Sequence, residues 1–150
     1  MNVDFNQLYL STEGRIGRRD FWIGVAGLLV VGIIIGLITL VVAGLESFLS
    51  RLLSFIGQII LAYPAFCLMA KRFQDRDRPG TFAAIPIGVA LVIGLIQLTG
   101  LSGSIANPNW FGVLLGWVDL GIFVWILIDL AILRGTVGNN QFGPDPVAAM

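Results

Sequence analysis

The chain has 150 residues, 57% of them hydrophobic and 12% charged, and its mean hydropathy is +0.90. Soluble domains carry about 25% charged residues, so this chain lacks the polar side chains that would cover a water-exposed surface. Its formal net charge is zero, it has no histidine, and Cys67 is its single cysteine. These counts exclude the basic balance of nucleic-acid-binding proteins, histidine-based catalysis and an intrachain disulfide, and they predict a chain that lies in lipid.

The N-terminal segment, residues 1–20, is mixed and polar. Asp4 can cap a short helix that places Phe5, Leu8 and Tyr9 on one face, a pattern typical of a helix in the membrane interface. So short a helix is marginal alone, and an unstructured tail fits this part of the sequence equally well.

The first long apolar stretch, residues 21–45, contains no charged residue. As a helix it is about 37 Å long, enough to cross a bilayer with some tilt. It is too long for the apolar region of a signal peptide, so it predicts an uncleaved first transmembrane helix. Small residues at helical spacing along it predict the close approach of another helix. This stripe consists of Gly32, Gly36, Thr39 and Ala43.

Three further transmembrane helices are expected. The second contains Pro64, which removes a backbone donor and should kink it. No charge occurs between Arg78 and Asp119, and one straight helix across that stretch would be about 60 Å long, twice the hydrocarbon thickness. The chain must therefore fold back, at the turn-rich residues 102–109. The expected domain, residues 21–133, comprises helices 21–45, 52–70, 82–101 and 110–133, and residues 134–150 form a tail.

The distribution of basic residues predicts the orientation of these helices. Eight of the nine Lys and Arg residues lie in residues 1–20, 71–80 and 134–150, and Arg51 is the exception. Cytoplasmic loops carry an excess of Lys and Arg. The chain is therefore predicted to be an all-α membrane protein with four transmembrane helices and with both termini in the cytoplasm.

Three motifs lie on the predicted cytoplasmic side: GRIGRRDFW at residues 14–22, KRFQD at 71–75 and GNNQFGPDP at 138–146. Their order and spacing and the four-helix layout resemble domain-of-unknown-function family 805 of small bacterial inner-membrane proteins, over about residues 11–146. The resemblance implies the fold and a place in the bacterial inner membrane, and it implies no activity. Gln74 stands where the family usually has a histidine, so no proton-carrying histidine is transferred to this chain.

Charged and polar residues of these motifs meet at one membrane surface, where they predict a composite site for anionic lipid headgroups or a protein partner. Each basic group near an anionic leaflet contributes about 1 kcal/mol of attraction. Alternatively, the same charges serve only topology and surface ion pairs. The candidate residues are Arg15, Arg18, Arg19, Lys71, Arg72, Asp75, Asn140 and Asp145.

Asp119 is the outstanding polar residue within a predicted span. A carboxylate at a helix centre costs about 2.5–3.5 kcal/mol. Gly112, Gly116 and Asp119 follow at helical spacing, so Asp119 is expected to face another helix rather than lipid. It could be a proton or cation site, a hydrogen-bonded carboxyl that holds helices together, or a carboxyl near enough to the outer interface to be hydrated.

Asp129 lies near the cytoplasmic end of the same span and is expected to be structural. Its predicted partners are Lys71, Arg72 or Arg134. The sequence has neither paired intramembrane carboxylates nor a metal-binding motif, so it predicts no metal, no cofactor and no enzymatic activity. The leading expectation is a non-enzymatic membrane module, associated with itself or with another membrane protein. The alternative is a small oligomeric transporter or channel that uses Asp119.

Overall fold

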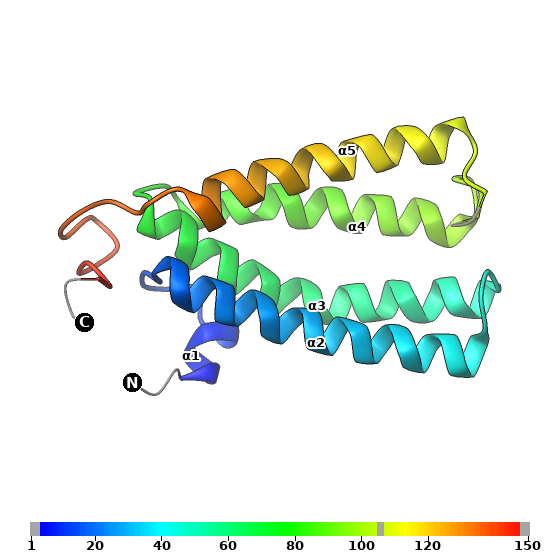
Figure 1. Ribbon diagram of the computed structural model, residues 1–150, viewed down its shortest axis with the longest axis horizontal. Helices are drawn as coiled ribbons and strands as arrows, with labels where there is room; N and C mark the ends of the chain where they lie inside the picture. Colours follow the sequence, from blue (N-terminus) through cyan, green and yellow to red (C-terminus); the bar gives the residue numbers. More distant parts are fainter. Residues whose placement is uncertain (1–3, 105–106, 148–150) are drawn as a thin grey trace.

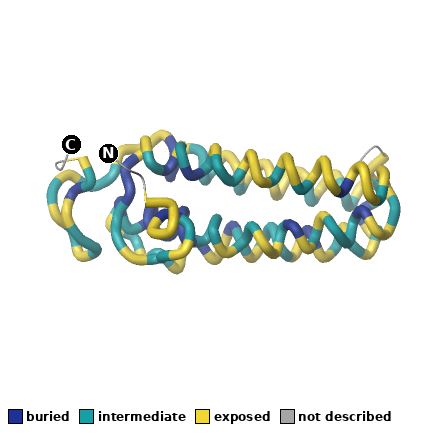
Figure 2. Tube along the Cα trace, turned by 90° about the horizontal axis from the view of Figure 1, so that it is seen from below, coloured by how far each residue is buried: buried dark blue, intermediate teal, exposed yellow. Residues whose placement is uncertain are grey.

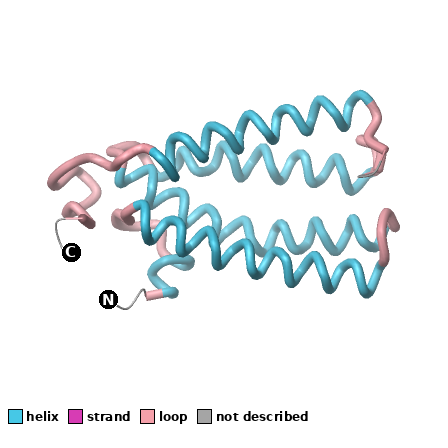
Figure 3. The backbone as a smooth tube through the Cα atoms, in the orientation of Figure 1, coloured by secondary structure: helices cyan, strands magenta, loops and turns pink. Residues whose placement is uncertain are grey.

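The computed structural model describes residues 4–104 and 107–147. The described residues contain helices and no strand, and Figures 1 and 3 show the helices running side by side. The elements are α1 (Phe5–Leu10), α2 (Arg18–Ala43), α3 (Phe48–Asp75), η1 (Gly80–Ala83), α4 (Ala84–Thr99), α5 (Trp110–Ile126) and η2 (Leu127–Ile132).

Within the described ranges, four helical stretches are long and apolar enough to cross a membrane. They are Arg18–Ala43, Phe48–Asp75, Gly80–Thr99 and Trp110–Ile132. The predicted all-α fold with four membrane-spanning helices is thus confirmed. The cytoplasmic position of the termini stays a prediction, although α1 and the tail lie at the same end of the bundle (Figure 1).

Side chains at the helix starts explain where several elements begin. The Oδ1 of Asp4 accepts hydrogen bonds from the backbone N–H groups of Asn6 and Gln7, at 3.0 and 3.3 Å. Ser47 and Asn109 cap α3 and α5 in the same way. These acceptors satisfy N–H groups that have no partner within their own helix.

The largest departure from the predicted helix bounds is the end of α3, which continues five residues beyond 70, to Asp75. Lys71 and Arg72 were expected in a loop because they are charged. They stay helical because their side chains are buried among acceptors from other segments.

The helices pack in chain order: α2 against α3, α3 against α4, and α5 against α4, while η2 contacts both α2 and α3. A Cβ added to Gly57 of α3 would lie 2.6 Å from the Cγ2 of Ile35, so glycine permits this close crossing with α2. The two glycines of the predicted small-residue stripe do not make such a close contact, although Thr39 of that stripe is buried. Gly36 has no heavy atom of the described residues within 4 Å of an added Cβ, and Gly32 meets only Leu61, at 3.7 Å.

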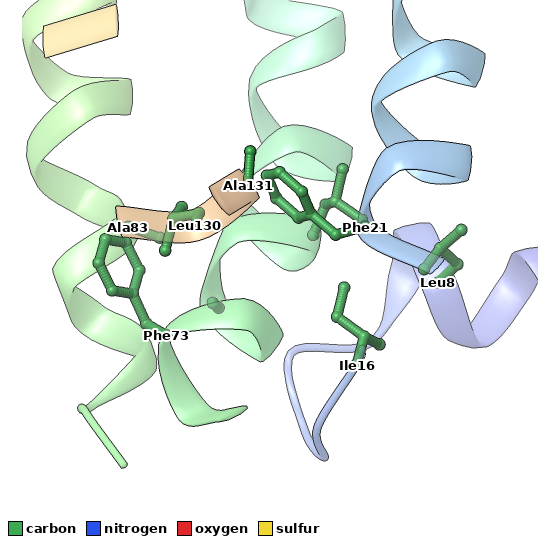
Figure 4. Close-up of a cluster of buried hydrophobic side chains, with 9 residues drawn as sticks. Leu8, Ile16, Phe21, Phe73, Ala83, Leu130 and Ala131 are labelled. Atoms are coloured by element: carbon green, nitrogen blue, oxygen red, sulfur yellow. The ribbon is translucent and has the colours of Figure 1, made fainter. Parts of the chain in front are cut away.

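The apolar core lies at the end of the bundle that carries α1 and the tail. It brings together side chains from α1, α2, α3, η1 and η2 and from the loop before α2 (Figure 4). Exposed residues run along the lengths of the long helices (Figure 2), as expected for faces that contact lipid. The core consists of Leu8, Ile16, Phe21, Leu68, Ala70, Phe73, Ala83, Leu130 and Ala131.

Candidate functional site

The polar groups of the three sequence motifs meet beside this core, in a region we call the charged cap (residues 4–20, 71–83 and 129–147). Arg15 links its parts. Its side chain is 1% exposed, and its Nη2 lies 3.1 Å from the Oδ1 of Asp75. Its Nη1 donates to the carbonyls of Gly138 and Gly143, at 2.7 and 3.1 Å, and its Nη2 donates to the carbonyl of Thr136, at 2.7 Å. One guanidinium thus joins the N-terminal segment, α3 and the tail.

Arg72 makes the second set of links and is fully buried. Its Nε donates to the carbonyl of Leu130 and its Nη2 to that of Leu133, both at 2.6 Å. Its Nη1 donates to the Oδ2 of Asp75 and, at 3.4 Å, to the carbonyl of Ile16. Carbonyls at the end of a helix have no intrahelical partner, so Arg72 caps η2 from α3.

Lys71 holds α1 against the bundle. Its Nζ donates to the carbonyl of Leu8, at 2.7 Å, and to that of Gln7. The hydroxyl of Tyr9 donates to the carbonyl of Gly24 in α2, at 2.9 Å. Of the two possibilities left open for this segment, the structure has the short helix, docked by tertiary contacts that a lone six-residue helix lacks.

Asp129 pairs with residues other than the three predicted partners. Its Oδ1 lies 2.8 Å from the Nη1 of Arg76, and its Oδ2 lies 2.6 Å from the Nη1 of Arg78. The prediction was wrong because Lys71 and Arg72 remain in the helix and donate to backbone carbonyls, while the chain after α3 carries Arg76 and Arg78 to Asp129.

The tail is folded onto the end of α3 and the turn that follows it. The Nδ2 of Asn140 donates to the carbonyl of Gln74, at 2.9 Å. The carboxylate of Asp145 accepts from the backbone N–H groups of Val147 and Gly138, each at 2.9 Å, and these bonds hold its pKa below the ordinary value. Asn140 and Asp145 therefore close the turns of the tail.

Two of the predicted basic site residues, Arg18 and Arg19, are exposed. Arg18 makes one hydrogen bond, to the carbonyl of Ile132, at 3.2 Å. The burial of the others could not be seen in the sequence, because their acceptors are mostly backbone carbonyls brought together by the fold. Among the predicted basic site residues, the exposed cations are therefore the two at the start of α2.

The structure places no other helix of the described chain against Asp119, which was expected to face a helix. None of the residues of α5, all of which are described, is buried, and Asp119 is exposed. Gly116 has no heavy atom of the described residues within 4 Å of an added Cβ, and Gly112 packs against the carbonyl of Ser102 in the preceding loop. Asp119 lies on the same side of the helix as these glycines by its spacing, but no described helix of the chain covers that side.

A polar cavity at the opposite end of the bundle was missed in the sequence analysis. It has a volume of about 590 Å³ and lies between α3, α4 and the loops that follow α2 and α4. Arg51, Ser54 and Gln58 line it from α3. Their spacing of three and four residues places them on one helix face, so this stripe could have been found in the sequence.

The described residues form four apolar helices long enough to span a bilayer, and the ion pairs of Asp75 with Arg15 and Arg72 are buried at one end of them. These features define a multi-pass membrane protein. The chain belongs to the family described as protein of unknown function (DUF805), whose model matches residues 9–144. This match confirms the resemblance found in the three motifs.

Two proteins of Escherichia coli strain K12 are similar to this chain. Uncharacterized protein YiiR is 32% identical over 143 residues, which cover 95% of this chain and 90% of the relative. Inner membrane protein YhaI is 26% identical over 138 residues, which cover 92% of this chain and 87% of the relative. No solved structure was found to match the chain.

Proposed function

We propose that this chain is a non-enzymatic module of the bacterial inner membrane that binds anionic lipid headgroups at its cytoplasmic face. The observation that carries the proposal is the exposure of Arg18 and Arg19 beside Trp22, which is 48% exposed. The name of the relative YhaI supports the inner membrane. The gathering of basic residues at this end supports the cytoplasmic orientation.

The start of α2 favours an anion in two ways. Arg18 and Arg19 are its first two residues, and Gly17 at its N-cap provides no side-chain hydrogen bond within the described structure. The N–H groups and the positive end of the helix dipole therefore act together with two cations. Asp20 in the same turn offsets part of this charge, so the site favours an anion over a zwitterion by a modest margin.

The exposed groups of α1 favour a lipid surface over a cytosolic protein at this face. Phe5 is 61% exposed and Leu10 is 60% exposed, on a helix held beside the start of α2. Apolar side chains next to exposed basic ones are typical of segments that lie in the headgroup region. Trp22 adds an aromatic ring of the kind found at membrane interfaces.

The proposal is tested by counting lipids retained by the protein purified from membranes of equal phosphatidylglycerol and phosphatidylethanolamine content. Replacing Arg18 and Arg19 together by Gln should lower the affinity for phosphatidylglycerol about fivefold per charge. The control Arg18→Lys with Arg19→Lys keeps both charges and should retain most of the lipid. Equal retention by the Gln variant and the parent, or recovery of a bound protein instead of the lipid, would overturn the proposal.

The exposure of Asp119 favours one alternative, a small oligomeric transporter or channel. A carboxylate on an uncovered helix face within the membrane is costly unless another chain or water meets it. In proteoliposomes, this alternative predicts a proton flux that Asp119→Asn abolishes and that Asp77→Asn, the same change at an exposed residue outside the spans, leaves unchanged. An absence of flux in the parent protein would exclude it.

A further inference from the structure

We propose that the cavity at the end opposite the charged cap binds a single-chain amphiphile with an anionic head group. The head group, a carboxylate or a phosphate, lies at Arg51, and the acyl chain lies between α2, α3 and α4. This site is separate from the headgroup site at the start of α2.

The polar part of the site is built around Arg51, the single Lys or Arg residue outside residues 1–20, 71–80 and 134–150. Its Nε is buried and has no hydrogen-bond partner within the described structure. A buried donor without an acceptor is costly, and a carboxylate or phosphate oxygen is the acceptor that a guanidinium binds best. Glu46 also lines the cavity and offsets part of its positive charge, so the guanidinium of Arg51 is a localised cationic group there.

Two glycines leave the space that the side chains of Arg51 and Gln58 occupy in the cavity wall. A Cβ added to Gly100 would collide with the Nη1 of Arg51, and one added to Gly94 would collide with the Oε1 of Gln58. The Nε2 of Gln58 donates to the carbonyl of Ala90, at 2.8 Å, which fixes the amide across α3 and α4. The two polar side chains are thereby held against α4 and its following turn.

An apolar pocket of about 370 Å³ adjoins the polar cavity and shares Ser54 and Gln58 with it. Its walls include Gly32 and Gly36 of α2, the small residues that were expected to contact another helix. Both volumes lie in the range of ligand sites, about 300–1,000 Å³. A cationic polar mouth that continues into an apolar pocket within a membrane protein matches a molecule with a charged head and a hydrocarbon tail.

The experiment uses the full chain in a non-ionic detergent and a dansyl-labelled undecanoic acid as the probe. We expect saturable binding of one probe per chain, displaced by palmitate, by lysophosphatidylglycerol or by both, and not by an uncharged monoacylglycerol. Displacement by palmitate alone assigns a carboxylate head, and displacement by lysophosphatidylglycerol alone assigns a phosphate head. Equal displacement by the monoacylglycerol would overturn the role of Arg51.

Two variants separate the head and the chain parts of the site. Arg51→Gln should weaken probe binding about tenfold or more, whereas Arg134→Gln, the same change at an exposed residue of the opposite end, should not. Gly36→Leu should abolish binding because a side chain there fills the apolar pocket without meeting a neighbour. Gly88→Leu, at an equally open glycine that lines neither cavity, is its matched control. Parent-like binding by both Arg51→Gln and Gly36→Leu would overturn the proposal.

Discussion

Asp75 accepts hydrogen bonds from two buried guanidinium groups, those of Arg15 and Arg72. One carboxylate faces two cations here, and burial of such a group is tolerated only where the remaining donors also find partners. Backbone carbonyls of the tail and of η2 accept those donors. The three side chains therefore stabilise the fold of the charged cap, and their charges are not available to bind a ligand.

Removing the carboxylate at this position should destabilise the protein strongly. Asp75→Asn leaves two buried cations without their counter-charge, a change that typically costs about 3–5 kcal/mol. Chemical unfolding in detergent measures the loss. Asp77→Asn, a similar change at an exposed residue whose side chain accepts a hydrogen bond from Gln141, should stay within about 0.5 kcal/mol. Equal destabilisation by the two variants would contradict the structural role of Asp75.

At the scale of elements, hydropathy was enough to predict the four spans, because an apolar stretch of this length has few other places to lie. The end of α3 could not be predicted, because Lys71 and Arg72 look like loop residues until the carbonyls of Leu8 and Leu130 are brought to them. The environment of Asp119 could not be predicted either. Periodicity places residues on one helix face but does not show what covers that face.

The last span offers a direct contrast between its two carboxylates. Asp119 is exposed, so Asp119→Asn should change the unfolding free energy of the single chain by less than about 0.5 kcal/mol. Asp129 pairs with Arg76 and Arg78, and Asp129→Asn should be clearly destabilising because these cations lose their counter-charge. Thermal unfolding of both variants in monomeric detergent-solubilised protein makes the comparison. A larger loss from Asp119→Asn would show that the carboxyl has a partner within the chain.

At the scale of the whole molecule, the chain has two dissimilar ends. The charged cap is closed by internal hydrogen bonds and leaves Arg18 and Arg19 exposed, whereas the opposite end is open and polar around Arg51. Between these two ends, the four apolar helices expose hydrophobic side chains to lipid. The two proposed sites therefore face opposite sides of the membrane, and the sidedness of both depends on one orientation.

Cysteine accessibility in intact cells measures that orientation most directly. In a Cys67→Ser background, single cysteines are placed at Asn107, next to the open end, and at Gln141, in the tail. Both positions are exposed in the structure. With the charged cap in the cytoplasm, a membrane-impermeant maleimide should label position 107 from outside and label position 141 only after the membrane is permeabilised. Labelling of position 141 but not 107 in intact cells would contradict the orientation and, with it, the assignment of the charged cap to the cytoplasmic leaflet.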